Sequence, residues 1–362
     1  MEFTHISLRT SIEWFDNIVS VIGLTLNSVL FYLIIKKTSA RLKDYRPILI
    51  QNCLIDTFFS IVNMITKTQT DQKNGNFYMY MVGPLTNMPP PYNNLFLCFW
   101  VFALLYCLTG VPVQFLYRYL MIVKGIKITF SHYFKLLLSA FIAALAYASW
   151  TVYTFWPNPV SLEKAVPLLK ADHNYDEGIP SFVMASIDDW PLRILFTYAY
   201  VLVSGVYGII IFSSIKVWRH LKAMESQMTI QARDAQRQIT VTFIFQAIVP
   251  CVVSIIPIVL AVTMAFTHAN VPGVGLIVAL LYTITPVANP LLTLLVVTNY
   301  RKNFLLILQR IYRRNRKINP MTKSTMHEST HAAEGKIPSI NPYTEENVQL
   351  PVILGIKQGT VE

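Results

Sequence analysis

The chain has 362 residues, of which 54 % are hydrophobic and only 14 % are charged, and its formal net charge is +11. Soluble globular domains carry about 25 % charged residues, so this composition predicts an integral membrane protein. The basic excess does not indicate nucleic-acid binding. The lysines and arginines cluster beside the ends of apolar segments, where an anionic membrane surface attracts them.

Apolar segments of about 18 residues or more are long enough to cross a hydrocarbon core as helices. Seven such segments occur, at residues 18–35, 47–65, 94–116, 136–155, 194–215, 239–264 and 274–297. The sequence therefore predicts an all-α membrane protein in which residues 18–297 form a bundle of seven transmembrane helices.

Lysine and arginine indicate the orientation of this bundle, because cytoplasmic loops retain them during membrane insertion. With the N-terminus outside the cell, the cytoplasmic segments hold 24 of the 30 basic residues and the extracellular segments hold six. We therefore expect residues 1–17 to be extracellular and the C-terminal residues to be cytoplasmic.

Two different segments follow the last predicted span. Within residues 298–318, Phe304, Leu305, Leu308 and Ile311 share one helical face, which predicts an amphipathic helix on the anionic inner leaflet. Residues 319–362 are rich in Thr, Ser, Pro, Glu and Lys and are expected to form a disordered cytoplasmic tail.

Asp56 is the one ionisable side chain inside the predicted spans, and a charge in hydrocarbon is costly enough to indicate function. Counted from the nearest cytoplasmic basic residue, Asp56 lies roughly 15 Å deep, Asn27 roughly 13 Å and Asn289 roughly 18 Å. The two amides are therefore candidates to hydrogen-bond the carboxylate. The sequence leaves open whether this network is only structural or rearranges when helices move.

Residues 242–260, TFIFQAIVPCVVSIIPIVL, are apolar but contain two prolines. Proline lacks an N–H group and clashes with the carbonyl four residues earlier, so each proline bends its helix. Pro250 and Pro257 are nearly two turns apart, so both bends lie on nearly the same face, and Gln246 is expected to face the bundle. The residues assigned to hinges are Pro112, Gln246, Pro250, Pro257, Pro286 and Pro290.

Arg118 lies where the third predicted span reaches the cytoplasm. One interpretation is an arginine that extends its side chain to the lipid headgroups. The other is an arginine that locks neighbouring helices together.

The sequence disfavours catalysis. No predicted span contains a histidine, and the chain has no Walker loop, GxSxG or HExxH motif. The last span also lacks the lysine that a retinal Schiff base requires. We therefore predict no enzyme activity and no cofactor.

The chain resembles G-protein-coupled receptors in the placement of a few residues. These are Asp56 in the second span, Arg118 at the inner end of the third and the Asn289-Pro290 pair in the seventh, with a basic amphipathic segment after it. Over residues 18–302 the chain is most similar to nematode serpentine chemoreceptors, above all to their delta class. The similar stretches are KKTSARLKDYRPILIQNCLIDTF, RYLMIVKG, QARDAQRQITVTFIFQAIVP and NPLLTLLVVTNYRK.

The sequence departs from the wider receptor pattern at three positions. Tyr117 replaces the acid that usually precedes the arginine, Thr293 stands near the position of a tyrosine, and Leu85 stands where related chemoreceptors often have cysteine. Mechanisms of rhodopsin-like receptors therefore transfer only in part.

The resemblance implies a sensory receptor in the plasma membrane of sensory neurons or cilia. A small external molecule would bind in the outer half of the bundle, and a heterotrimeric G protein would bind the inner face. Candidate ligand contacts, which could instead be lipid-facing aromatic residues, are Phe99, Trp100, Phe196, Tyr200, Thr263 and Tyr282. Candidate G-protein contacts, which could instead only set the topology, are Arg118, Lys216, Arg219, Arg237 and Arg301.

A membrane transporter or a ligand-gated channel is the alternative class. Many transporters are built from internal repeats, and seven spans without internal similarity argue against them. A channel would need a polar face along several spans, which the sequence does not show.

Overall fold

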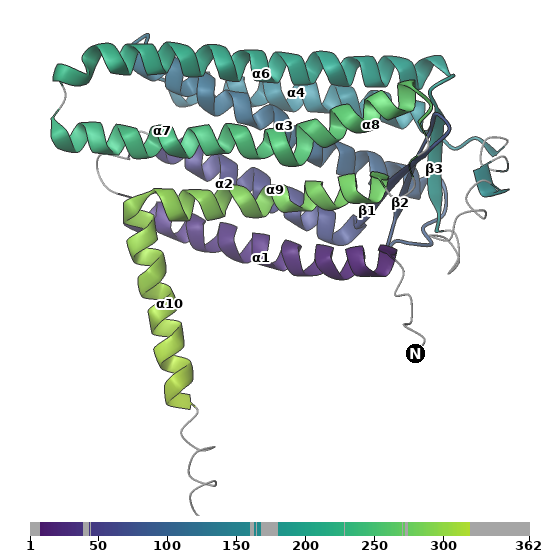
Figure 1. Ribbon diagram of the computed structural model, residues 1–362, viewed down its shortest axis with the longest axis horizontal. Coiled ribbons are helices and arrows are strands. Elements are labelled where there is room, and N and C mark those ends of the chain that lie inside the picture. The colour runs from purple at the N-terminus through teal and green to yellow at the C-terminus, as the bar shows by residue number, and fades with distance from the viewer. Residues whose placement is uncertain are drawn as a thin grey trace, which may run out of the picture. The chain divides into compact units, whose positions relative to one another are not determined.

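The computed structural model describes residues 8–38, 43, 45–159, 163, 165–167, 180–227, 229–269, 271 and 274–318. Within these residues, seven helical segments are long and apolar enough to cross a membrane, which confirms the predicted bundle (Figure 1). They are α1 (Leu8–Lys37), α2 (Arg46–Thr66), α3 (Tyr92–Ile122), α4 (Phe130–Thr154), α6 (Trp190–Met224), the composite of α7 (Ile230–Pro250), a π-helical segment (Cys251–Ile255) and α8 (Ile256–Phe266), and α9 (Val274–Val296).

The first helix is longer than the apolar segment that predicts it. It begins at Leu8, so much of the expected extracellular segment 1–17 is helical. Hydropathy alone starts the first span at Ile18, because Glu13 and Asp16 interrupt the apolar segment before it. Both Ile12 and Asp16 are nevertheless buried, since they occupy the face of α1 that packs into the bundle.

Three strands form an antiparallel sheet that the all-α expectation did not include. The order is β1 (Thr68–Lys73), β2 (Asn76–Met81) and β3 (Phe182–Ser186). Asn74 and Gly75 connect β1 to β2 with φ angles of 49° and 77°. Both residue types tolerate positive φ, which is why Asn-Gly favours two-residue hairpin turns. We call the end of the bundle that carries this sheet the sheet end (Figure 1).

The third helix lies at the centre of the bundle. In the most apolar 18-residue stretch of α3, 72 % of the residues are buried inside the protein, whereas 28 % are buried in the corresponding stretch of α4. The apolar faces of α3 reach both main hydrophobic clusters, one at the sheet end and one at the opposite end. The third helix therefore contributes buried side chains at both ends of the bundle.

The sixth span is interrupted where the sequence predicts bends. The α-helix ends at Pro250, five π-helical residues follow, and α8 restarts with Pro257 in its first turn. In contrast, α3 and α9 continue as α-helices through Pro112, Pro286 and Pro290.

A further helix, α10 (Thr298–Ile318), follows the seventh span. Its first turns pack against the bundle: the Tyr300 hydroxyl is 2.9 Å from that of Thr38, and the Asn299 amide donates to the Lys37 carbonyl. The predicted disordered tail, residues 319–362, lies outside the described residues.

Candidate functional site

A cavity of about 90 Å³ lies inside the bundle at the sheet end. Side chains of α3, α4, α6, α8, α9 and the β1–β2 hairpin line it, and nearly all of its surface is apolar. Three of the six predicted ligand contacts are part of the lining: Trp100, Phe196 and Tyr282. The cavity therefore suits a small and mainly apolar molecule.

The β1–β2 hairpin covers this cavity. The Phe77 ring packs edge-on against the rings of Phe196 and Phe155. The ring centroids are 5.5 Å apart for Phe196 and 6.1 Å apart for Phe155. On the neighbouring strand, the Thr70 hydroxyl donates a 3.0 Å hydrogen bond to the Gly275 carbonyl. A Cβ on Gly275 would lie 2.4 Å from the Thr70 carbonyl oxygen, so only glycine permits this close contact between α9 and β1.

The sheet buries polar groups as well as aromatic rings. Tyr78 of β2 is fully buried and packs against Phe182 of β3, with 6.1 Å between the ring centroids. Burial, together with the charge of Asp71, raises the pKa of Tyr78 to about 12. This hydroxyl therefore stays neutral at any physiological pH.

The other three predicted ligand contacts lie outside the cavity lining. Tyr200 of α6 and Thr263 of α8 bind one another, with 2.7 Å between their hydroxyl oxygens. Phe99 is 45 % exposed and packs edge-on against Phe58. The structure thus gives Tyr200 and Thr263 a helix-joining contact and Phe99 a place on the outer surface of the bundle.

Trp100 joins the cavity wall to a buried carboxylate. Its indole Nε1 donates to Asn63 Oδ1 at 2.8 Å, and Asn63 Nδ2 donates to Asp16 Oδ1 at 3.0 Å. Thr283 Oγ1 donates to the same Asp16 oxygen at 2.5 Å. Four helices, α1, α2, α3 and α9, therefore meet at one hydrogen-bonded cluster, which we call the Asp16 cluster: Asp16, Asn63, Trp100 and Thr283.

Sequence reasoning missed Asp16 because it placed this residue outside the first span. A signal was nevertheless present, since small or polar residues recur every three or four positions from Asp16 to Asn27. Asp16, Ser20 and Asn27 are all buried on this face. Helical periodicity therefore identifies the face, whereas mean hydropathy does not.

Asp56 and Asn289 meet in the middle of the bundle. Asn289 Nδ2 lies 3.1 and 3.3 Å from the two carboxylate oxygens of Asp56, and the Cys107 thiol lies 3.4 Å from one of them. The structure gives Asn27 a different partner: its Nδ2 donates to the Pro286 carbonyl at 2.8 Å. Pro290 has no N–H group to donate to that carbonyl, so Asn27 stabilises the proline-containing part of α9.

The hinge region of the sixth span makes its polar contacts with α6 and α9. The Tyr207 hydroxyl donates to the Ala247 carbonyl at 2.8 Å. Ser254 lies 2.9 Å from Thr285, and Gln246 Nε2 donates to Thr293 at 3.2 Å. Hydroxyl groups of α9 therefore contact the sixth span before the π-helical segment, at Gln246, and within it, at Ser254.

Arg118 is buried, with 4 % of its surface exposed. Its Nη2 donates to Thr240 of α7 at 2.7 Å, and its guanidinium carbon lies 5.0 Å from the centroid of the Phe243 ring. Among the residues that the structure describes, none of the ion pairs includes Arg118. The side chain in this conformation therefore contacts a neighbouring helix and does not extend to lipid headgroups.

The other predicted G-protein contacts lie at the end of the bundle opposite the sheet. These exposed residues are Lys216, Arg219, Arg237 and Arg301.

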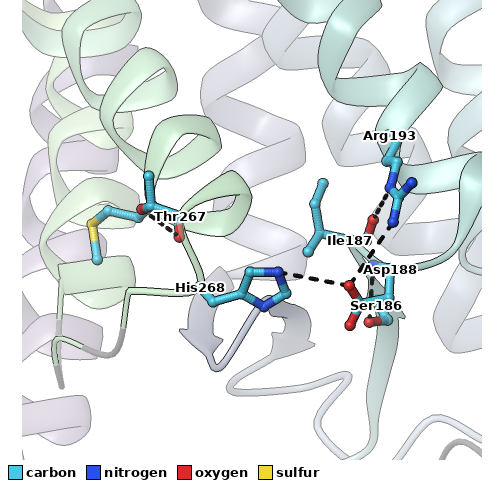
Figure 2. A network of polar contacts seen from close by, with 7 residues as sticks. Ser186, Ile187, Asp188, Arg193, Thr267 and His268 are labelled. Atoms are coloured by element: carbon cyan, nitrogen blue, oxygen red, sulfur yellow. Dashed lines mark hydrogen bonds and ion pairs between the residues drawn. The ribbon is translucent and has the colours of Figure 1, made fainter.

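Figure 2 shows a polar contact at the sheet end that is separate from the Asp16 cluster. It joins His268, after the end of α8, to Asp188, before the start of α6. Asp188 Oδ1 lies 3.6 Å from His268 Nε2 and 3.9 Å from Arg193 Nη2. Arg193 Nε also donates to the Ile187 carbonyl at 2.7 Å. All three side chains are about half exposed or more, so these contacts contribute little to stability.

The structure is a bundle of seven apolar helical segments with an internal cavity and with buried polar groups between the helices. A family model described as serpentine type 7TM GPCR chemoreceptor Str matches residues 12–305. The chain belongs to this family of G-protein-coupled receptors and is a multi-pass integral membrane protein. The matching description is Str, so the match supports the serpentine chemoreceptors without supporting the delta class.

A solved structure shares the fold. The crystal structure of squid rhodopsin matches with a TM-score of 0.59 at 13 % identity, covering 84 % of this chain and 86 % of that chain. No curated protein matches the sequence. The family assignment therefore depends on the family model, and the structural likeness supports the fold alone.

Proposed function

We propose that this chain is a sensory receptor that binds a small, mainly apolar external molecule in the cavity at the sheet end and activates a heterotrimeric G protein. The cavity and its connection through Trp100 to the Asp16 cluster carry the proposal. An apolar ligand that fills this space changes the packing of Trp100 and Tyr282, whose ring centroids are 5.9 Å apart.

The seventh span transmits this change. Tyr282 lines the cavity, and the next residue, Thr283, binds Asp16. Further along α9, Asn289 binds Asp56 and Thr293 binds Gln246. A small rotation of α9 therefore alters contacts with α1, α2 and α7 together, and the π-helical segment lets the sixth span bend in response.

Movement of the sixth span separates Arg118 from Thr240. A hydrogen bond from a charged donor contributes about 1.5–3 kcal/mol, which is enough to hold a resting conformation but small enough for a ligand to overcome. Once released, Arg118 joins Lys216, Arg219, Arg237 and Arg301 in the surface that binds the G protein. In this proposal the surface faces the cytoplasm and the sheet end faces outward, as the distribution of basic residues favours.

The remaining assignments belong to the same proposal. The receptor acts in the plasma membrane of sensory neurons or their cilia. The basic face of α10 lies on the anionic inner leaflet. Within the serpentine chemoreceptors, the delta class is supported only by the sequence stretches that resemble it.

Expression of the full chain with a promiscuous G protein tests the function. Cells are exposed to a panel of small apolar molecules, and calcium or cyclic nucleotide is measured. We expect at least one compound to give a response that G-protein inhibition abolishes. A ligand-evoked current that persists during this inhibition would instead support a channel.

A further inference from the structure

A second hollow lies at the end of the bundle opposite the sheet, between α3, α6 and α7. This groove has a volume of about 230 Å³. Its floor is formed by the buried side chains of Phe115, Val217 and Phe243. Its rim is formed by Ile215, Trp218 and Ile244, which are 44 %, 55 % and 50 % exposed. Apolar side chains exposed on a membrane-spanning helix face lipid, so the groove opens toward the bilayer.

Two hydrogen-bond donors in this groove have no acceptor. Arg118 Nε and Ser213 Oγ are both buried, and neither has a partner among the described residues. Ser213 is 0 % exposed and Arg118 is 4 % exposed, so water does not readily replace the missing acceptors. Native proteins leave few buried polar groups unpaired, so two in one apolar groove indicate a bound group that supplies acceptors.

The charge of the groove specifies what kind of acceptor fits. Arg118 carries a fixed positive charge, and a buried charge needs a counter-ion. Tyr117 stands where an acid precedes the arginine in the wider receptor pattern, and its ring packs on Tyr133 at 5.4 Å between centroids. The missing negative charge is therefore not supplied by the neighbouring residue, and an anion from outside the chain can supply it.

The groove continues into a polar hollow at the tip of the bundle. Trp218 and Thr240 line both spaces. The polar hollow adds Lys222, Arg233 and Arg237 against the acids Glu225 and Asp234. Basic residues beside an apolar groove match a ligand with a negative head and an apolar tail.

We propose that this groove binds one anionic phospholipid from the adjacent leaflet. A phosphate oxygen accepts hydrogen bonds from Arg118 Nε and Ser213 Oγ, and an acyl chain lies against Phe115, Phe243 and Ile244. Phosphate suits this position because a guanidinium binds it through charge-assisted hydrogen bonds. The inference depends on the membrane fold and not on the ligand cavity or on G-protein activation, so its test needs neither.

Native mass spectrometry of the purified full chain provides this test. The receptor is titrated with phosphatidic acid, phosphatidylcholine or oleate, and retained molecules are counted. We expect one tightly retained phosphatidic acid, with about tenfold weaker retention of phosphatidylcholine and oleate. Equal retention of phosphatidylcholine, preferential retention of oleate, or retention of no lipid would overturn the proposal.

Variants locate the lipid. Arg118→Gln and Ser213→Val remove the two donors and are expected to lower the affinity for phosphatidic acid by about tenfold and severalfold, respectively. Ile244→Trp narrows the groove while keeping both donors, so it remains informative if Arg118→Gln does not fold. Arg219→Gln removes an exposed charge that does not line the groove and is the matched control. Unchanged affinity in Ser213→Val and Ile244→Trp, or an equal loss in Arg219→Gln, contradicts the assigned site.

Discussion

The indole nitrogen of Trp100 donates a 2.8 Å hydrogen bond to the side-chain oxygen of Asn63. This bond joins the cavity wall to the Asp16 cluster, because Asn63 in turn binds Asp16. A molecule in the cavity can therefore influence the packing of α1 and α9 without touching either carboxylate of the bundle.

Replacing Trp100 with Phe tests this connection. The variant keeps an aromatic wall but removes the N–H group, which leaves Asn63 Oδ1 without its donor. We expect about a tenfold loss of agonist potency, equivalent to about 1.4 kcal/mol, at unchanged surface expression. Agonist dose–response curves of the wild type and the variant measure this loss of potency. Trp150→Phe is the control, because Trp150 donates to the Pro191 carbonyl outside the cavity lining; an equal effect of both changes would argue against a specific role for Trp100.

Asp16 is expected to stabilise the bundle as an acceptor of two hydrogen bonds. Asp16→Ala leaves Asn63 and Thr283 without this acceptor and should lower the free energy of unfolding by about 1–3 kcal/mol. Asp16→Asn keeps an oxygen acceptor and should cost less. Thermal unfolding of the purified receptor compares them. Glu13→Ala, which removes the partly exposed 2.7 Å ion pair with Lys67, should cost no more than about 1 kcal/mol. A larger loss for Glu13→Ala than for Asp16→Ala would contradict this ranking.

Several of these features can be predicted from the sequence, and several cannot. The seven spans follow from long apolar segments, and the pairing of Asp56 with Asn289 follows from their similar depth. Depth does not reveal which way a side chain points around its helix. For this reason the sequence alone could not predict that Asn27 hydrogen-bonds the Pro286 carbonyl. It also could not separate Trp100 in the cavity from Phe99 on the outer surface.

The sheet was missed for a different reason. Residues 66–93 contain no apolar segment long enough for a span, so hydropathy identifies them only as the connection between the second and third spans. The Asn74-Gly75 turn signal was present, yet strand pairing with Phe182–Ser186 depends on contacts between distant parts of the chain. Local patterns do not specify such pairing.

The contact between Asp56 and Asn289 can be tested by exchanging the two side chains. Asp56→Asn and Asn289→Asp are each expected to reduce the maximal agonist response, since each removes the carboxylate–amide pair. The double variant restores an acid and an amide in exchanged positions and should recover part of the response. Signalling is normalised to surface expression. Simple addition of the two losses would mean that the pair does not act as a unit.

Pro250 is expected to supply the bend that activation needs. Pro250→Ala restores an N–H group at the start of the π-helical segment and favours a straighter helix. The variant should bind agonist with unchanged affinity but give a lower maximal response. Pro47→Ala is the control, because Pro47 occupies the first turn of α2, where proline causes no bend. If both variants signal as the wild type does, the bend at Pro250 has no part in activation.

The central claim is that occupancy of the cavity at the sheet end activates a G protein at the opposite end. The most direct measurement uses the purified receptor and a purified heterotrimeric G protein in lipid nanodiscs, with guanine-nucleotide exchange as the readout. We predict that an agonist accelerates exchange, that Trp100→Phe shifts its concentration dependence, and that Arg118→Ala abolishes the acceleration while agonist still binds. Agonist binding that leaves exchange unchanged in the wild-type protein, with any G protein tested, would contradict the claim.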